Sequence, residues 1–145
     1  MPHRRIKEVL RRQHLLHLGP TVSVREAARK MSERHVAVVI VTEGADRLDG
    51  IFTESDLLDR VVVPGLDTDA TPLSKVMTAN PATVGPEQAV REALAIMDGK
   101  GVRHLPVVEE GRVLGVVSMR DFIGEEVAVL ERRHQIEDQY AEHMR

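Results

Sequence analysis

Two short polar motifs contain the residue types that could do chemistry in this chain. They are Thr53-Glu-Ser-Asp56 and Ser118-Met-Arg-Asp121, each a hydroxyl followed three residues later by a carboxylate. One interpretation is a capping box, in which both side chains bind backbone N–H groups at the start of a helix. The other is a ligand site, in which the hydroxyl and the helix N-terminus donate to a phosphate and the carboxylate accepts from sugar hydroxyls. The spacing alone leaves both interpretations open.

The two motifs belong to an internal repeat that covers most of the chain. Residues 17–31 align without a gap on residues 83–97, and residues 50–58 align on residues 115–123. A repeat of this length indicates one structural unit present twice, with each copy covering the apolar face of the other. We therefore expect a pseudo-two-fold body with two related clefts, one at each motif.

Both copies predict the same order of elements: helix, short strand, helix, strand, strand, helix. Apolar residues at helical spacing begin at Val24 and Val90, and β-branched runs follow at residues 36–42 and 102–108. The segment between the copies is rich in Pro, Gly and Asp, which predicts a linker. The expected units are a first repeat at residues 5–58, the linker at 59–71, a second repeat at 72–123 and a C-terminal helical extension at 124–145.

The bulk composition excludes several classes of function. Of the 145 residues, 42% are hydrophobic and 30% are charged, as in a globular protein. The absence of cysteine excludes disulfides and thiolate metal sites. A net charge of -3, with no Trp and only one Tyr and two Phe, argues against a polyanion binder that stacks bases. No apolar stretch approaches membrane-spanning length, so the expected location is the cytoplasm.

The histidines and carboxylates predict neither a metal site nor an active site. His14 and His17 are the only close pair among seven histidines, and no His-Glu-x-x-His pattern accompanies them. The chain also lacks a Gly-x-Ser-x-Gly nucleophile motif and a Gly-rich phosphate loop. The repeat assigns Asp56 and Asp121 to different clefts, so they are not expected to form an acid–base pair. We therefore expect a protein that is not an enzyme and holds no metal.

The repeated unit resembles a CBS domain. Residues 105–122 are similar to the end of that domain, and residues 76–84 are similar to its beginning. The similarity extends from Arg5 to Ile123, so the chain resembles a free-standing CBS pair, or Bateman module. The resemblance implies an α/β (α+β) fold in which each repeat has a small, mostly three-stranded sheet packed on helices, with a pseudo-two-fold axis between the repeats. It also implies that the clefts bind adenine nucleotides or related adenosyl ligands and that the protein forms homodimers.

The resemblance also implies roles for individual residues. A hydroxyl contacts phosphate and an Asp holds the ribose, while the first strand and the start of the next strand line the cleft. The ligand-binding residues expected on this basis are Thr53, Asp56, Ser118, Asp121, His17, Thr83, Ala37, Val38, Arg103 and His104.

The two copies differ at these positions in ways that have physical consequences. Arg103 and His104 offer donors to phosphate, whereas Ala37 and Val38 offer only apolar contact, as to an adenine face. We therefore favour the second-copy cleft as the better phosphate site. An ordinary surface charge is the alternative for Arg103, and the Arg11-Arg12 pair is an alternative source of positive charge in the first copy.

The sequence thus predicts a regulatory module that reversibly binds an adenosine-containing ligand and changes conformation. The ligand is AMP, ADP, ATP or an S-adenosylmethionine type, none of them an obligatory cofactor, and the partner is an effector protein of unknown identity. One alternative is a ligand-free interaction protein that acts through dimerisation. Another is a nucleic-acid-associated regulator that uses the basic segment at residues 4–12.

Overall fold

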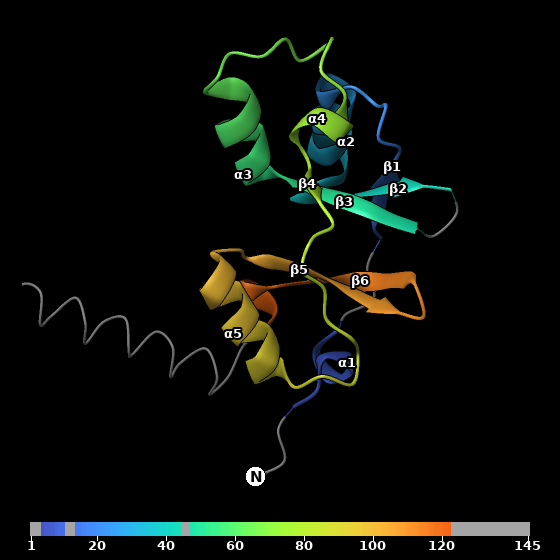
Figure 1. Ribbon diagram of the computed structural model, residues 1–145, viewed down its shortest axis with the longest axis vertical. Coiled ribbons are helices and arrows are strands. Elements are labelled where there is room, and N and C mark those ends of the chain that lie inside the picture. The colour runs from blue at the N-terminus through green and yellow to red at the C-terminus, as the bar shows by residue number, and fades with distance from the viewer. Residues whose placement is uncertain (1–3, 11–13, 45–46, 123–145) are drawn as a thin grey trace, which may run out of the picture.

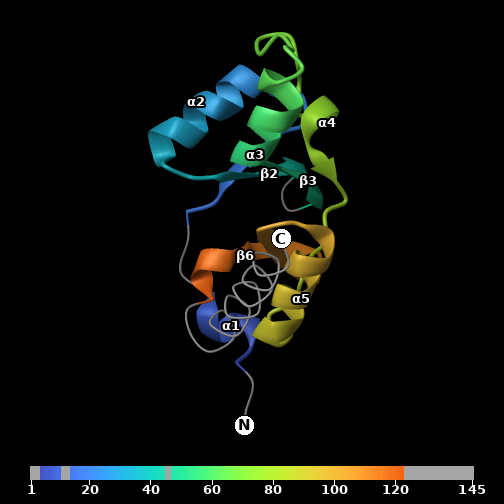
Figure 2. The same ribbon diagram turned by 90° about the vertical axis from the view of Figure 1, so that its left-hand side faces the viewer.

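The computed structural model describes residues 4–10, 14–44 and 47–122. In it the chain forms two stacked α+β halves (Figure 1). The two sheets face each other at the middle of the molecule, and the helices cover their outer faces (Figure 2). The predicted α+β architecture with a repeated unit is confirmed. The C-terminal extension expected at residues 124–145 and the Arg11-Arg12 pair lie outside the described residues.

The first half contains a four-stranded sheet in the order β1-β2-β3-β4. Its central strands form an antiparallel hairpin, and β1 pairs with β2 in parallel. The elements of this half are β1 (Leu16–Leu18), α2 (Val24–Arg34), β2 (Val38–Glu43), β3 (Arg47–Thr53), α3 (Glu54–Asp56), the π-helical segment η1 (Leu57–Val62), α4 (Leu73–Val76) and β4 (Thr78–Ala79). Helical backbone therefore continues to Val62, past residue 58, where the first repeat is expected to end.

The fourth strand of this sheet comes from the second repeat, which the sequence analysis does not anticipate. In β4, Ala79 pairs with Gly50 and Thr78 pairs with Ile51. A Cβ atom on Gly50 would lie 2.7 Å from both Met77 Sδ and the Thr78 carbonyl oxygen. Glycine therefore allows β4 to approach the sheet closely.

The second half has a smaller sheet than the expected three strands. It contains α1 (Ile6–Val9), α5 (Val90–Lys100), β5 (His104–Glu109), β6 (Arg112–Ser118) and the 3-10 turn η2 (Met119–Asp121). The third strand is reduced to a single parallel bridge between Val84 and Val107. Val84 donates to the Pro106 carbonyl and accepts from Val108, but Pro86 has no N–H with which to continue this ladder.

Each repeat begins with one short helix, α1 in the first and α4 in the second, and these two helices are exchanged between the halves. Ile6 of α1 belongs to the core of the second half, with Val90, Met97 and Phe122. Leu73 of α4 belongs instead to the core of the first half.

Matching backbone hydrogen bonds hold the exchanged segments. The Ile6 N–H donates to the Gln88 carbonyl at 2.9 Å, and the Leu73 N–H donates to the Val22 carbonyl at 2.9 Å. Each short helix therefore packs on the repeat to which it does not belong in sequence.

A third apolar cluster joins the two sheets. It consists of buried Ile40, Ile51 and Val116, with Leu15, Val38, Leu48 and Val113 packed around them. Because these residues come from both repeats, the cluster fixes the two sheets against each other. No helix within the described ranges is long and apolar enough to cross a bilayer.

Candidate functional site

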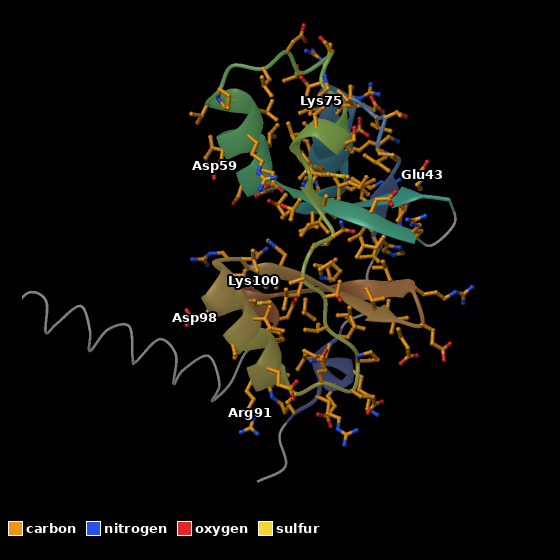
Figure 3. All side chains as sticks on the ribbon, in the orientation of Figure 1. Glu43, Asp59, Lys75, Arg91, Asp98 and Lys100 are labelled. Carbon is orange, nitrogen blue, oxygen red and sulfur yellow. The ribbon has the colours of Figure 1, made fainter. Side chains whose placement is uncertain are left out.

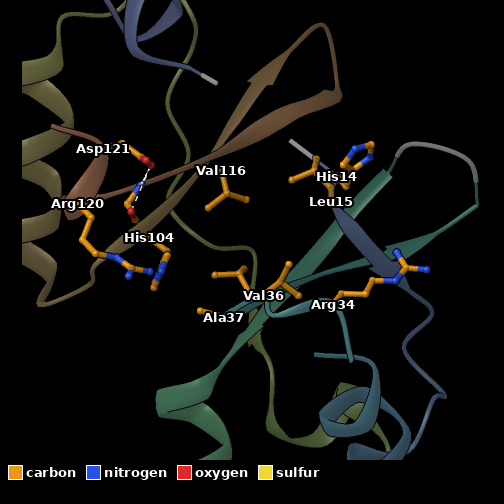
Figure 4. A pocket seen from close by; sticks show the side chains of 11 residues that line it. His14, Leu15, Arg34, Val36, Ala37, His104, Val116, Arg120 and Asp121 are labelled. Atoms are coloured by element: carbon orange, nitrogen blue, oxygen red, sulfur yellow. Dashed lines mark hydrogen bonds between the residues drawn. The ribbon is translucent and has the colours of Figure 1, made fainter. Parts of the chain in front are cut away.

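Two neighbouring cavities open between the halves. The inter-repeat cavity has a volume of about 700 Å³ and is lined by His14, Leu15, Arg34, Val36, Ala37, Val38, His104, Val116, Ser118, Arg120 and Asp121 (Figure 4). The axial cavity has a volume of about 230 Å³ and is lined by Ala37, Thr53, Glu54, Ser55, Arg103, His104, Ser118, Met119 and Arg120.

The inter-repeat cavity combines an apolar wall with a polar end. The first repeat supplies Val36, Ala37 and Val38 from the start of β2 and the residues before it. The second repeat supplies Ser118 and Asp121 from the end of β6 and from η2. A ligand in this cavity would therefore contact both repeats, with its apolar part against residues 36–38 and a polar part against Ser118 and Asp121.

Positive charge borders this cavity on two sides. Arg120 lies beside Asp121 in η2, whereas Arg34 extends from the end of α2 on the other side (Figure 4). The imidazoles of His14 and His104 also contribute to the lining. Since Asp121 is the single carboxylate among these lining residues, the cavity is suited to an anion.

Asp121 forms the predicted capping box and also lines the inter-repeat cavity. Its Oδ2 atom accepts from the Ser118 backbone N–H at 2.7 Å and from the Ser118 hydroxyl at 3.2 Å. Both hydrogen bonds end on Oδ2, and Oδ1 takes part in neither. The two interpretations of this motif are therefore compatible at Asp121, because capping uses one carboxylate oxygen.

Asp56 forms a similar cap but lines neither of the two cavities. Its Oδ2 accepts from the Thr53 N–H at 2.9 Å, and its own N–H donates to Thr53 Oγ1 at 3.2 Å. The Arg60 Nε atom lies 3.6 Å from Asp56 Oδ1, and the same guanidinium donates to the Val76 and Met77 carbonyls. The structure thus engages Asp56 in holding η1 against α4. Its ribose-binding role stays a prediction.

The remaining expected residues divide between the cavities. Ala37 and His104 line both, Val38 lines the inter-repeat cavity, and Thr53 and Arg103 line the axial cavity. His17 and Thr83 are exposed and line neither. In β1 the side chains alternate between the two faces, so the burial of Leu16 leaves His17 on the opposite side.

Several lining residues were missed by the sequence analysis. These are His14, Leu15, Arg34, Val36, Val116 and Arg120 in the inter-repeat cavity, and Glu54, Ser55 and Met119 in the axial cavity. Arg120 had a usable signal, because it stands inside the Ser118-Met-Arg-Asp121 motif. Arg34 had none, because it lies at the C-terminal end of α2, outside the motifs that the sequence singles out.

The axial cavity lies on the pseudo-two-fold axis. It is lined by matched residues of the two repeats, which are Ala37 with Arg103, Thr53 with Ser118, Glu54 with Met119, and Ser55 with Arg120. Each pair joins a residue to its repeat equivalent. Only the second repeat supplies arginines, so the charges on the two sides of the axis differ.

Burial of His104 lowers its pKa below the ordinary value of 6.5. The nearby Arg120 and Arg103 guanidinium groups lower this pKa further, whereas the Asp121 and Glu54 carboxylates oppose the shift. The imidazole is therefore neutral near pH 7, with one nitrogen that donates and one that accepts. In the part of the chain that the structure describes, no group of three or more His, Asp or Glu side chains is placed to hold a metal ion.

Comparison with known proteins identifies the fold and the repeats. The family model for the CBS domain matches residues 6–63 and again residues 73–127. The chain belongs to the CBS-domain family. A CBS domain-containing protein of Arabidopsis thaliana is 37% identical over 123 residues, which cover 85% of this chain and 23% of that protein. The chain therefore spans about a quarter of the length of this relative.

Solved structures of similar proteins match the fold of this chain. A CBS domain protein from Pyrobaculum aerophilum complexed with AMP is 31% identical, with a TM-score of 0.76 over 88% of this chain and 96% of that one. A conserved protein from Pyrococcus horikoshii is 34% identical, with a TM-score of 0.76 over 82% of this chain and 89% of that one. These matches confirm the predicted CBS-pair fold.

Proposed function

We propose that this CBS pair is a regulatory module that binds an adenine nucleotide in the inter-repeat cavity. The observation that carries the proposal is that the cavity has an apolar wall, mostly Val36, Ala37 and Val38 of the first repeat, and a polar end made of Ser118, Asp121 and Arg120 of the second repeat. Its volume of about 700 Å³ is within the usual range for small-ligand sites. The AMP complex of the similar Pyrobaculum aerophilum protein supports the choice of ligand.

Each part of a nucleotide has a suitable counterpart in the cavity. The base packs against Ala37, Val38 and Val116, because these side chains offer apolar surface. Asp121 accepts from the ribose hydroxyls through the carboxylate oxygen that the cap does not use. The Ser118 hydroxyl and the Arg120 guanidinium bind the phosphate, and the guanidinium gives charge-assisted hydrogen bonds.

Regulation follows from the position of the ligand between the repeats. A nucleotide that contacts both halves binds most tightly to the arrangement that brings both sets of residues into reach. It therefore shifts the population toward that arrangement, and a partner protein detects the change. The protein acts in this proposal by binding and not by catalysis. The homodimer, the effector protein and the cytoplasmic location stay predictions from the sequence.

Matched substitutions of the two capping aspartates test the proposal. Asp121→Ala and Asp56→Ala each remove a carboxylate that accepts from the backbone N–H at the start of a helical turn, at 2.7 and 2.9 Å. We expect both variants to lose about 1 kcal/mol of stability from the cap. Asp121 alone lines the inter-repeat cavity, so only Asp121→Ala should weaken AMP binding, by about tenfold or more.

Isothermal titration calorimetry with AMP gives the affinities, and thermal unfolding gives an independent reading. At a ligand concentration of about 100 times Kd, binding stabilises the folded protein by about 2.7 kcal/mol, and a tenfold loss of affinity reduces this to about 1.4 kcal/mol. AMP affinity that is unchanged in Asp121→Ala would contradict the proposed site. Binding of S-adenosylmethionine but of no nucleotide would contradict the phosphate assignment.

A further inference from the structure

The axial cavity adjoins the phosphate end of the proposed nucleotide site. Ala37, His104, Ser118 and Arg120 line both cavities, so these four residues form a common border. Ser118 and Arg120 are the groups assigned to the first phosphate. Any further phosphates attached to this first phosphate would therefore extend into the axial cavity.

The charge of the axial cavity favours such a chain. Arg103 lines the axial cavity only, and Arg120 lines both cavities, so two guanidinium groups face one carboxylate, that of Glu54. The hydroxyls of Thr53 and Ser118 add neutral donors. A volume of about 230 Å³ is enough for one or two phosphate groups.

We propose that the ligand of this protein is a nucleoside diphosphate or triphosphate whose phosphates beyond the first occupy the axial cavity. This inference rests on the proposed function, because it places the nucleoside in the inter-repeat cavity. Arg103 binds the second phosphate and thereby sets the preference for polyphosphates over a monophosphate. The Glu54 carboxylate repels the same phosphate and thereby reduces that preference. The difference between the repeats at Ala37 and Arg103 thus determines which nucleotide is bound.

The experiment compares AMP with ADP by calorimetry at one pH and low salt, without divalent cations. We expect ADP to bind about tenfold more tightly than AMP, because one more charge-assisted contact forms. In Arg103→Gln the ratio of the two affinities should fall to about one. In Glu54→Gln the ratio should rise, because the opposing carboxylate is gone. Glu54 is exposed, so this second variant is expected to keep the fold.

Arg91→Gln is the matched control, because it removes the same charge at an exposed position of α5 at the far end of the second half (Figure 3). It should leave the ratio unchanged, which separates a local contact from the effect of net charge. Equal affinities of the unsubstituted protein for AMP and ADP would overturn the inference while leaving the proposed function intact. An unchanged ratio in Arg103→Gln would also overturn it. Failure of both nucleotides to bind would overturn the proposed function itself.

Discussion

The exchange of the two short helices makes a prediction that can be tested without a ligand. Ile6 in α1 and Leu73 in α4 are equivalent positions of the repeat, and both side chains are 0% exposed. Ile6 packs in the core of the second half, and Leu73 packs in the core of the first. Substituting each with alanine should therefore destabilise the half that the residue contacts, not the half that contains its own repeat.

The expected magnitude follows from the loss of buried carbon atoms. Each substitution removes most of a fully buried aliphatic side chain, which costs about 2–5 kcal/mol when the cavity does not collapse. For a chain of this size, about 3 °C of Tm is lost per kcal/mol, so Tm should fall by about 6–15 °C. Thermal unfolding followed by circular dichroism measures this decrease.

Hydrogen exchange then shows where the loss of stability occurs. In Ile6→Ala the amides of β5 and β6 should lose more protection than those of β2 and β3, and in Leu73→Ala the order should be reversed. The two variants act as controls for each other, since each removes a buried aliphatic group of similar size. Greater loss of protection in β2 and β3 after Ile6→Ala would refute the assignment of α1 to the second core. Identical patterns of lost protection in both variants would show that the two halves do not have separate cores.

Two further predictions concern the sheet and the buried histidine. Gly50→Ala should lower the free energy of unfolding by about 1–3 kcal/mol, because the new Cβ would lie 2.7 Å from the Thr78 carbonyl oxygen, which cannot rotate away. Urea unfolding measures this loss, and an unchanged midpoint would show that β4 does not approach the sheet as described. Because the folded-state pKa of His104 lies below its ordinary value of 6.5, the unfolded chain binds more protons, so stability should fall as pH drops from about 7 toward the folded-state pKa. His104→Gln should lose less stability than the unsubstituted protein between about pH 7.5 and 5.5 in urea titrations, and equal losses in both would contradict the buried, neutral imidazole.

Local sequence patterns determined the elements and the capping motifs. The helical spacing from Val24 and Val90 corresponds to α2 and α5, and the β-branched runs correspond to the hairpins that follow them. Thr53 and Ser118 stand at the starts of helical turns as expected. These features depend on contacts between residues close in sequence, and the repeat showed each of them twice.

Nonlocal packing decided which of the expected site residues come together. Ser118 and Asp121 meet Ala37 and Val38 of the other repeat, whereas Asp56 is engaged by Arg60 and lines neither cavity. The sequence treats the two motifs as equivalent. They differ because the Arg60 guanidinium pairs with the Asp56 carboxylate, whereas Asp121 lines the inter-repeat cavity. This difference depends on the directions of the side chains in the fold.

The sequence by itself determined that one unit is present twice, each copy with a Thr/Ser-x-x-Asp motif, because a duplicated pattern of apolar and turn residues specifies a duplicated unit. The resemblance of this unit to a CBS domain indicated its family. Only the tertiary structure decided that α1 and α4 exchange partners and that Arg120 borders two cavities. The physical reason is that an apolar stripe specifies burial but not the surface that buries it. Ile6 and Leu73 would satisfy the same hydrophobic pattern on either core, and the backbone pairing of α1 with Gln88 and of α4 with Val22 selects between them.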